Sequence, residues 1–213
     1  MTGLARFLHR AGALKFVPRT GWLHRGVPAA EVESVADHSW RTALLAWLAA
    51  AAQPELDRTR VLLLALIHDL AEAMTGDLPP YDPTALAGAD EQTRRRLLNR
   101  RHIRSEEQRQ AKRAAEAAAI ADLLAGLPSP LAEELRALWN ELEEGQTAEA
   151  RFVKQADKLE TYLQSLEYAE ADPRRPMASF AAEVDEVIDM PALIALRQAI
   201  RSLRYGRQPP SST

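Results

Sequence analysis

Residues 65–80, with the sequence ALIHDLAEAMTGDLPP, carry several ionisable side chains at the end of a strongly apolar segment. His68 and Asp69 are adjacent, so on a helix they point about 100° apart and can both line one pocket at the helix flank, and Glu72 lies on the same side about one turn later. A buried carboxylate without a partner costs several kcal/mol, so three ionisable groups in such a segment need a strong partner. A divalent cation would be one. A hydrogen-bonded His–Asp pair in the core is the simpler alternative when this segment is considered alone.

Two more residues could complete a metal site. His38, in SVADHSW, stands near the start of another predicted helix, and Asp157, in FVKQADKLE, stands inside an apolar-periodic helix, where aspartate is disfavoured. Together with His68 and Asp69 they would form a site of two histidines and two aspartates, which suits Mn²⁺, Fe²⁺, Co²⁺, Mg²⁺ or Zn²⁺. The sequence has no cysteine, so a thiolate metal site and a thiolate nucleophile are excluded.

The segments that must position these residues are all predicted to be helical, because apolar residues recur at helical spacing and no strand-like alternation is present. Ser34 and Asp37 have the spacing of a capping box, and Asp57 can cap the next helix. That next helix, 58–74, is apolar almost all round and is expected to be the central buried helix. Helices are predicted at 3–15, 34–52, 58–74, 90–126 (as one helix or two), 129–144, 147–171, 177–189 and 191–204. The prediction is a single all-α domain over residues 1–205, followed by a disordered tail, 206–213.

The run RRRLLNRRHIR, residues 94–104, has six arginines in eleven residues and raises the question of a nucleic-acid surface. Acidic residues follow on the same predicted helix, and no aromatic residues alternate with the arginines for base stacking. We therefore predict a solvated helical face with salt bridges, and no nucleic-acid polymer as partner.

The composition supports a globular protein without a membrane partner. Hydrophobic residues make up 46% and charged residues 27% of the 213 residues, and the formal net charge is −3. This charge gives no general attraction to nucleic acid or to an anionic membrane. The N-terminus is too polar for a signal peptide, and no stretch reaches about 18 apolar residues. We expect a cytoplasmic protein.

The order His, His-Asp, Asp along an all-α chain resembles the HD-domain metal-dependent phosphohydrolases. The likeness extends to one branch, the small HD-domain 5'-deoxynucleotidases, and covers most of residues 7–170. A single His-Asp pair is a weak motif, but the ordered set with GDLPP and FVKQADKLE is specific. The matching blocks are FVPRTGW, ESVADHSWR, LALIHDLAEAMTGDLPP, AEELRALWNELEEGQTAEARFVKQADKLE and LEYAE. The resemblance implies an HD-domain helical bundle, and a homodimer, because relatives form homodimers.

The resemblance also implies roles for individual residues. The implied metal ligands are His38, His68, Asp69 and Asp157. Glu72 matches an acid that engages the attacking water or, in some relatives, a second metal that Asp77 can join.

The residues around these ligands would contact the substrate. The loop after the His-Asp segment matches a substrate-contacting loop, and it consists of Asp77, Leu78, Pro79 and Pro80. The family reads its nucleotide partly through an Arg-Trp pair that precedes the first metal histidine. Arg19 and Trp22 are the residues available here, three positions apart rather than adjacent, which departs from the family pattern.

The function expected from this resemblance is a metal-dependent 5'-deoxynucleotidase, which converts deoxyribonucleoside monophosphates to deoxynucleosides and phosphate. The chemistry is consistent, because phosphate monoesters hydrolyse very slowly without catalysis and a bound cation lowers the pKa of its water. Three alternatives stay open at this point. One is an HD-domain hydrolase acting on a cyclic nucleotide, a triphosphate or an alarmone. Another is a di-iron oxidase, which would need more histidine ligands, and the last is a non-catalytic helical metal-binding scaffold.

Overall fold

The computed structural model describes residues 1–205, and the predicted tail, 206–213, lies outside the described residues. Within residues 1–205 all regular secondary structure is helical, apart from one isolated bridge between Pro18 and Ser34. The prediction of an all-α domain is therefore confirmed. None of the described helices is both long and apolar enough to span a membrane.

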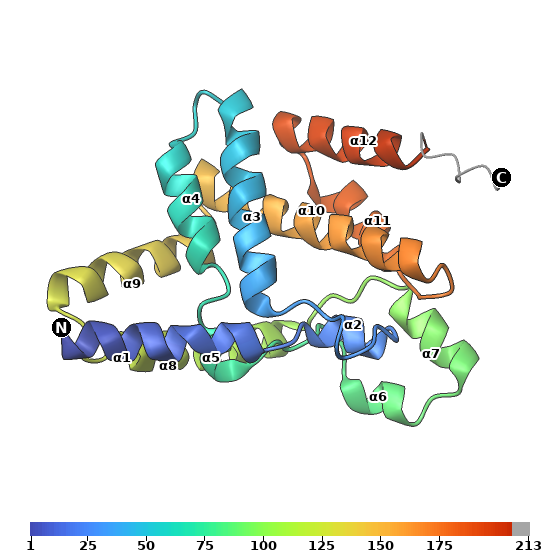
Figure 1. Ribbon diagram of the computed structural model, residues 1–213, viewed down its shortest axis with the longest axis horizontal. Helices are drawn as coiled ribbons and strands as arrows, with labels where there is room; N and C mark the ends of the chain where they lie inside the picture. Colours follow the sequence, from blue (N-terminus) through green and yellow to red (C-terminus); the bar gives the residue numbers. More distant parts are fainter. Residues whose placement is uncertain (206–213) are drawn as a thin grey trace.

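Short and long helices pack together into one bundle (Figure 1). In chain order they are α1 (Thr2–Ala11), η1 (Gly12–Phe16), α2 (Thr20–His24), α3 (Val35–Ala49), η2 (Ala50–Ala52), α4 (Arg58–Ile67), α5 (Glu72–Thr75), α6 (Pro83–Ala87), α7 (Glu91–Leu98), α8 (Glu106–Leu124), α9 (Ser129–Glu144), α10 (Ala148–Ala171), α11 (Ala178–Val187) and α12 (Pro191–Tyr205). The bounds of α9, α10 and α12 agree closely with the predicted ones. The capping boxes begin α3 at Ser34 and α8 at Ser105.

The central helix of the bundle is α10. It packs against α3, α4, α9, α11 and α12, and it crosses behind α3 in the view of Figure 1. Its buried residues Phe152, Val153, Ala156 and Leu159 recur every three or four positions, as expected of a helix whose one side faces the core. The helices that carry the candidate metal ligands, α3, α4 and α10, therefore contact one another directly.

The prediction of one continuous, central buried helix over residues 58–74 is wrong in two respects. Its first part, α4, ends at Ile67, and residues 68–71 form a turn before the short helix α5. In this turn the amide of Leu70 bonds to the carbonyl of Ile67, so the hydrogen bonds span three residues instead of four. The helix is also not buried all round, because Leu66 is 57% exposed. Apolar composition predicted a helix correctly, but it did not show that part of this helix has no neighbour within residues 1–205.

The region predicted as one or two helices over 90–126 is two helices, α7 and α8, joined by residues 99–105 without regular structure. Ser105 and Gln108 form the capping box that begins α8: the Ser105 hydroxyl accepts from the Gln108 amide, and the Gln108 side chain accepts from the Ser105 amide. The arginine-rich run is therefore divided. Its first three arginines lie on α7, and its last three lie in the connecting segment.

The core packing around α10 can be tested by truncating a buried side chain. Phe152 has no exposed surface, and Phe152→Ala should lower the free energy of unfolding by about 3–5 kcal/mol, because it removes apolar contacts and leaves a cavity. Leu66→Ala, on the exposed side of α4, should change it by less than about 0.5 kcal/mol. Urea unfolding followed by circular dichroism measures both. Equal losses for the two variants would contradict the packing described here.

Candidate functional site

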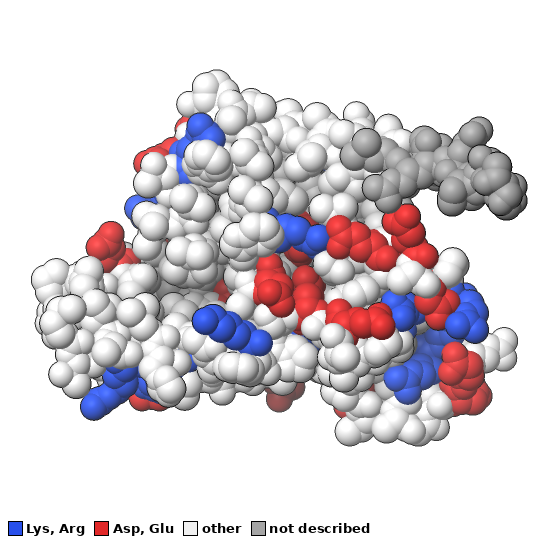
Figure 2. Space-filling view, viewed as in Figure 1, with Lys and Arg blue, Asp and Glu red and all other residues white. Residues whose placement is uncertain are grey.

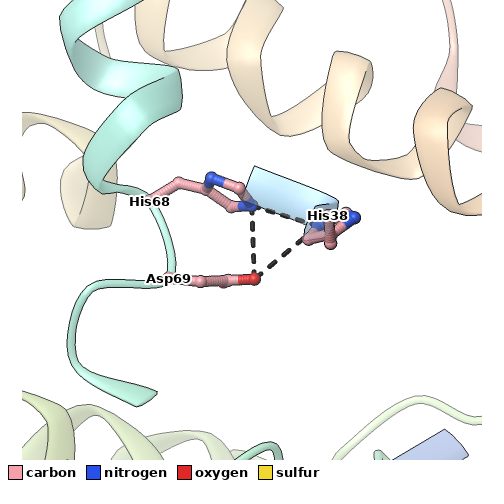
Figure 3. Close-up of side chains that lie close together, drawn as sticks. All are labelled: His38, His68 and Asp69. Carbon is pink, nitrogen blue, oxygen red and sulfur yellow. Dashed lines mark hydrogen bonds and ion pairs between the residues drawn. The ribbon is translucent and has the colours of Figure 1, made fainter. Parts of the chain in front are cut away.

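Three of the four predicted metal ligands converge at one point (Figure 3). His38 lies in the first turns of α3, His68 ends α4, and Asp69 lies in the turn that follows. The two Nε2 atoms are 3.2 Å apart, and Oδ2 of Asp69 lies 3.3 Å from Nε2 of His68 and 3.6 Å from Nε2 of His38. The turn at residues 68–71 thus holds Oδ2 of Asp69 near the Nε2 atoms of both histidines.

The fourth predicted ligand, Asp157, approaches this cluster from α10. Its Oδ1 lies 3.2 Å from Nε2 of His38, and its Oδ2 accepts a hydrogen bond from Nζ of Lys158 at 2.9 Å. Asp157 thus contacts the cluster through His38. The structure brings together all four residues that the sequence singled out, from segments 30 or more residues apart.

The donor atoms of this cluster fit a divalent cation. Nδ1 of His68 lies 2.7 Å from the carbonyl oxygen of Ala65, and Nδ1 of His38 lies against a carboxylate oxygen of Glu160. Each neutral ring would therefore carry its proton on Nδ1 and direct the Nε2 lone pair to the centre. Ligand atoms about 2.1 Å from one ion, at neighbouring corners of its coordination shell, lie about 3.0–3.4 Å apart. The observed separations are close to these values, so His38, His68 and Asp69 could hold a metal ion.

The charges in the cluster also call for a cation. Burial opposes the charged forms, yet neighbouring Asp69 and Asp157 raise the pKa of His68 to about 9. Burial likewise opposes ionisation of Asp69, but His68 and Arg19 hold its pKa below the usual range. Positive charge is therefore favoured at this point at neutral pH. Protons on the imidazoles or a metal ion in their place can supply it.

Glu72, the first residue of α5, lies beside the cluster and is only 5% exposed. Its Oε2 has no hydrogen-bond partner within residues 1–205. Burial and the charge of Asp69 raise the pKa of Glu72 to about 9, and Arg19 opposes the shift only in part. A buried carboxyl oxygen without a partner is rare in proteins and leaves this group free to bind a water or a substrate atom.

Arg19 lies in the site, as predicted. It precedes α2, a short helix within a segment expected only as a break, and its Nη1 donates to Oδ2 of Asp69 at 3.2 Å. Its Nη2 donates to Oγ1 of Thr161 at 3.4 Å, and its Nη1 is 4.0 Å from Asp77. Burial disfavours the charged guanidinium, but Asp69 and Asp77 raise its pKa, so Arg19 carries a positive charge next to the cluster.

Trp22 occupies a different environment from Arg19. It is 2% exposed, and its ring packs on Tyr168 and Phe180 at centroid distances of 5.2 and 4.8 Å. Its Nε1 donates to Glu33 at 2.8 Å. Trp22 is among the residues that line the cavity beside the cluster, but its side chain is buried in a core cluster. Its contact with a substrate stays a prediction.

The loop after α5 forms one side of this cavity, through Asp77, Leu78, Pro79 and Pro80. Gly76 starts the loop with a φ of +71°, a conformation that glycine adopts without steric cost. The loop is held by α2, because the amide of Thr20 donates to Oδ2 of Asp77 at 2.5 Å and the Thr20 hydroxyl donates to the Asp77 carbonyl at 2.9 Å. The Asp77 carboxylate is thereby oriented next to Arg19.

Another part of the cavity wall is basic, which the sequence analysis did not predict. The cavity has a volume of about 420 Å³, and the segment 99–112 contributes Arg100, Arg101, His102, Ile103, Arg104, Arg109 and Lys112 to its lining. Lys and Arg side chains also gather over α7 (Figure 2). The prediction that the arginine run is only a solvated helical face is therefore wrong for its second half. The capping box at Ser105 was the signal that could have shown the break.

One hydrogen bond ties this basic segment to the loop after α5. The guanidinium of Arg104 donates to the carbonyl of Leu78 in that loop. Arg109 donates in turn to the carbonyl of Arg104 at 2.7 Å. Arg101 pairs with Glu186 of α11, whereas Arg100 is exposed. The basic segment is thus connected to the loop, and it lines the same cavity as Asp69, Glu72 and Asp157.

Comparison with known proteins agrees with this geometry. The profile of the HD domain matches residues 11–190 of the chain. The chain belongs to the HD domain family. The family and the fold predicted from the sequence are confirmed.

Individual relatives of this HD-domain chain include two named enzymes. The chain is 38% identical over 171 residues to the 5'-deoxynucleotidase HDDC2 of Xenopus laevis, covering 80% of this chain and 72% of the relative. It is 33% identical over 162 residues to the 5'-deoxynucleotidase hdd1 of Schizosaccharomyces pombe, covering 76% of this chain and 70% of the relative.

Two solved structures are also similar to this HD-domain chain. A conserved hypothetical protein from Pyrococcus furiosus has 30% identity and a TM-score of 0.63, covering 93% of this chain and 98% of the other. A protein from Magnetospirillum magnetotacticum, described as a predicted metal-dependent phosphohydrolase, has 25% identity and a TM-score of 0.61, covering 96% and 93%. The helical arrangement is therefore shared with proteins of similar length.

The charge balance of the cluster predicts how metal affinity depends on pH. The pKa of His68 is about 9 in the metal-free protein, so this ring is protonated below that pH and its proton must leave when an ion takes its place. Affinity for Co²⁺ should therefore rise between about pH 6 and pH 8, by up to about tenfold per pH unit for each proton displaced. Calorimetric titration in buffers of different ionisation enthalpy measures both the Co²⁺ affinity and the number of protons released. A pH-independent affinity with no proton release would contradict the cluster described here.

Proposed function

We propose that this chain is a metal-dependent 5'-deoxynucleotidase, which hydrolyses deoxyribonucleoside 5'-monophosphates to a deoxynucleoside and phosphate. The observation that carries the proposal is the cluster of His38, His68 and Asp69, of which Asp69 lines a cavity together with the unpartnered carboxyl of Glu72. The identity with several relatives named as 5'-deoxynucleotidases supports the choice of substrate.

The residues that would hold the ion are His38, His68, Asp69 and Asp157. When bound, a divalent cation supplies Lewis-acid chemistry towards water and a phosphoryl oxygen. Nitrogen and oxygen donors in this combination accept Mn²⁺, Co²⁺, Mg²⁺, Fe²⁺ or Zn²⁺. All four side chains come from helices or from the turn that follows α4.

Glu72 handles the proton of the attacking water in this proposal. Its raised pKa arises from burial and from the negative charge of Asp69. Positive charge next to Asp69 cancels that repulsion, so Glu72 can lose its proton and then accept one from the water. The free Oε2 is the atom that would accept it, and it has no competing partner within residues 1–205.

Arg19 and the cavity walls bind the substrate. Arg19 is the buried cation next to the cluster, and its guanidinium gives charge-assisted hydrogen bonds to a phosphate. The cavity of about 420 Å³ is in the range of small-molecule sites and suits a mononucleotide. The wall that contains Arg100 and Arg104 attracts the dianionic phosphate to the cavity. The loop Asp77–Pro80 and the edge of Trp22 cover the sugar and the base. The homodimer that the family resemblance implies stays a prediction.

The proposed reaction is tested by phosphate release from deoxy- and ribonucleoside 5'-monophosphates, with metal-stripped protein to which Mg²⁺, Mn²⁺, Co²⁺ or Zn²⁺ is added. Release from the deoxy series should depend on metal and should disappear in Asp69→Ala, which lacks one donor of the cluster. Glu72→Gln should keep its metal affinity but lose about 10²–10⁴-fold in kcat, because the amide cannot accept the proton. Absence of release from every monophosphate with every metal would exclude the proposal.

The basic wall predicts a separate kinetic effect. Arg100→Ala removes an exposed positive charge from the cavity rim and should raise KM up to about fivefold without changing kcat, as expected for a charge worth less than about 1 kcal/mol. Arg95→Ala is the matched control, because Arg95 is an exposed arginine of α7 outside the cavity. The difference in KM between the two variants should become smaller as salt is added, because salt screens the charge. Identical KM values for both variants would show that the wall does not attract the substrate.

A further inference from the structure

A polar seam runs between α3 and α10, and it begins at the metal cluster. His38 and Arg41 are three residues apart on α3, so they point to the same side. The guanidinium of Arg41 bonds to three residues of α10: Nε donates to Glu160 at 2.6 Å, Nη2 donates to Gln164 at 2.5 Å, and Nη1 donates to both oxygens of Glu167 at 3.0 and 2.9 Å. The arginine is therefore held in one orientation.

Glu160 is the member of this seam that touches the cluster. Its side chain has no exposed surface, as is also true of His38. One carboxylate oxygen accepts from Nδ1 of His38, and the other accepts from Arg41. A fully buried carboxylate carries a large desolvation cost, which these two partners must offset. Both oxygens are engaged, so Glu160 can move only if His38 or Arg41 moves with it.

The two histidines of the cluster are held by different kinds of acceptor. Nδ1 of His68 faces a backbone carbonyl, that of Ala65, at 2.7 Å, whereas Nδ1 of His38 faces the charged Glu160. A neutral carbonyl is sufficient to fix the ring and its tautomer. A carboxylate does the same and also makes the imidazole a stronger electron-pair donor through Nε2. Burying Glu160 is costly, but its carboxylate would make His38 a stronger electron-pair donor.

We propose that Glu160 is a positioning residue of the metal site, which directs Nε2 of His38 to the ion and strengthens it as a ligand, and that Arg41 holds Glu160 in place for this purpose. The proposal rests on metal binding as described under the proposed function, and it assigns a role to two residues outside the ligand set. In this proposal a charged carboxylate orients His38, whereas only a backbone carbonyl orients His68.

The opposing view is that Arg41 and Glu160 form an ordinary ion pair that joins α3 to α10. The two views differ in one measurable property. An ion pair with only a structural role lowers the stability of the protein when it is broken, but it leaves the metal affinity of the folded protein unchanged. A positioning role changes the affinity itself, whether or not stability falls.

The experiment is calorimetric titration of the metal-stripped full chain with Co²⁺, together with the visible absorption spectrum of the Co²⁺ protein. Glu160→Gln keeps the shape and an acceptor for Nδ1 but removes the charge, and it should weaken Co²⁺ binding about 10- to 100-fold and alter the spectrum. Glu141→Gln is the matched control, because Glu141 is also paired with an arginine, Arg60, and its side chain is 10% exposed. The control should bind Co²⁺ as the wild type does. Thermal melting shows which variants are folded.

Arg41→Met provides a second and independent variant, because the Arg41 side chain is 24% exposed and its replacement leaves the buried ligands in place. It should weaken Co²⁺ binding in the same direction, and it decides the matter if Glu160→Gln does not fold. Wild-type affinity and spectrum in the folded variants would overturn the proposal while leaving the nucleotidase intact. If the wild-type chain itself takes up no Co²⁺, the metal assignment fails, and this proposal fails with it.

Discussion

The structure depends on the close approach of groups that repel one another. Two imidazole nitrogens and a carboxylate oxygen, which come from α3, the end of α4 and the following turn, lie 3.2–3.6 Å apart, and Asp157 adds a second carboxylate at 3.2 Å from His38. Neutral rings that direct their Nε2 lone pairs at charged carboxylates repel them at these distances unless positive charge lies between them. The helices around the cluster are positioned so that this requirement can be met only by protons, by Arg19 at the edge, or by a cation.

Holding these groups together requires the contact between α3 and α10. The apolar side of α10 fixes its position against α3 and α4, and the polar seam then places Glu160 against His38. The same helix therefore contributes to the core and to the site. A loss of packing at Phe152 would lower the stability of the protein, whereas a loss of charge at Glu160 would change His38 as a metal ligand.

The sequence was sufficient to predict the helical class, most helix bounds and the residues that form the cluster. Histidine and aspartate are uncommon in apolar helical segments, so His68, Asp69 and Asp157 were visible without a structure. Residues whose role depends on three-dimensional neighbours were not visible. Glu160 looks like any helical glutamate, and Arg41 like any helical arginine, because a sequence does not tell which charged residues are buried. Trp22 was expected either as a substrate contact or as a core residue, and the sequence does not show which residues its ring packs on, Tyr168 and Phe180.

The breaks between helices were the other source of error. A continuous apolar pattern predicted one helix through residue 74, because periodicity reports which side of a segment is apolar and not where its hydrogen bonds stop. The break before Ser105 had a capping signal of its own, while the break after Ile67 had none, since His68 and Asp69 are compatible with a helix. Tertiary contacts therefore decide where α4 ends.

The end of α4 at Ile67 also has an electrostatic consequence. The last four carbonyl groups of a helix lack partners within it, and together they give the C-terminal end a partial negative charge. In α4 one of these carbonyls, that of Ala65, faces Nδ1 of His68, and that of Ile67 accepts a hydrogen bond from the amide of Leu70 in the turn. A helix that continued to residue 74 would use these groups for its own hydrogen bonds. By stopping early, α4 directs the negative end of its dipole at the place where the ligands need a positive charge, so the backbone contributes to the attraction for a cation alongside the side chains.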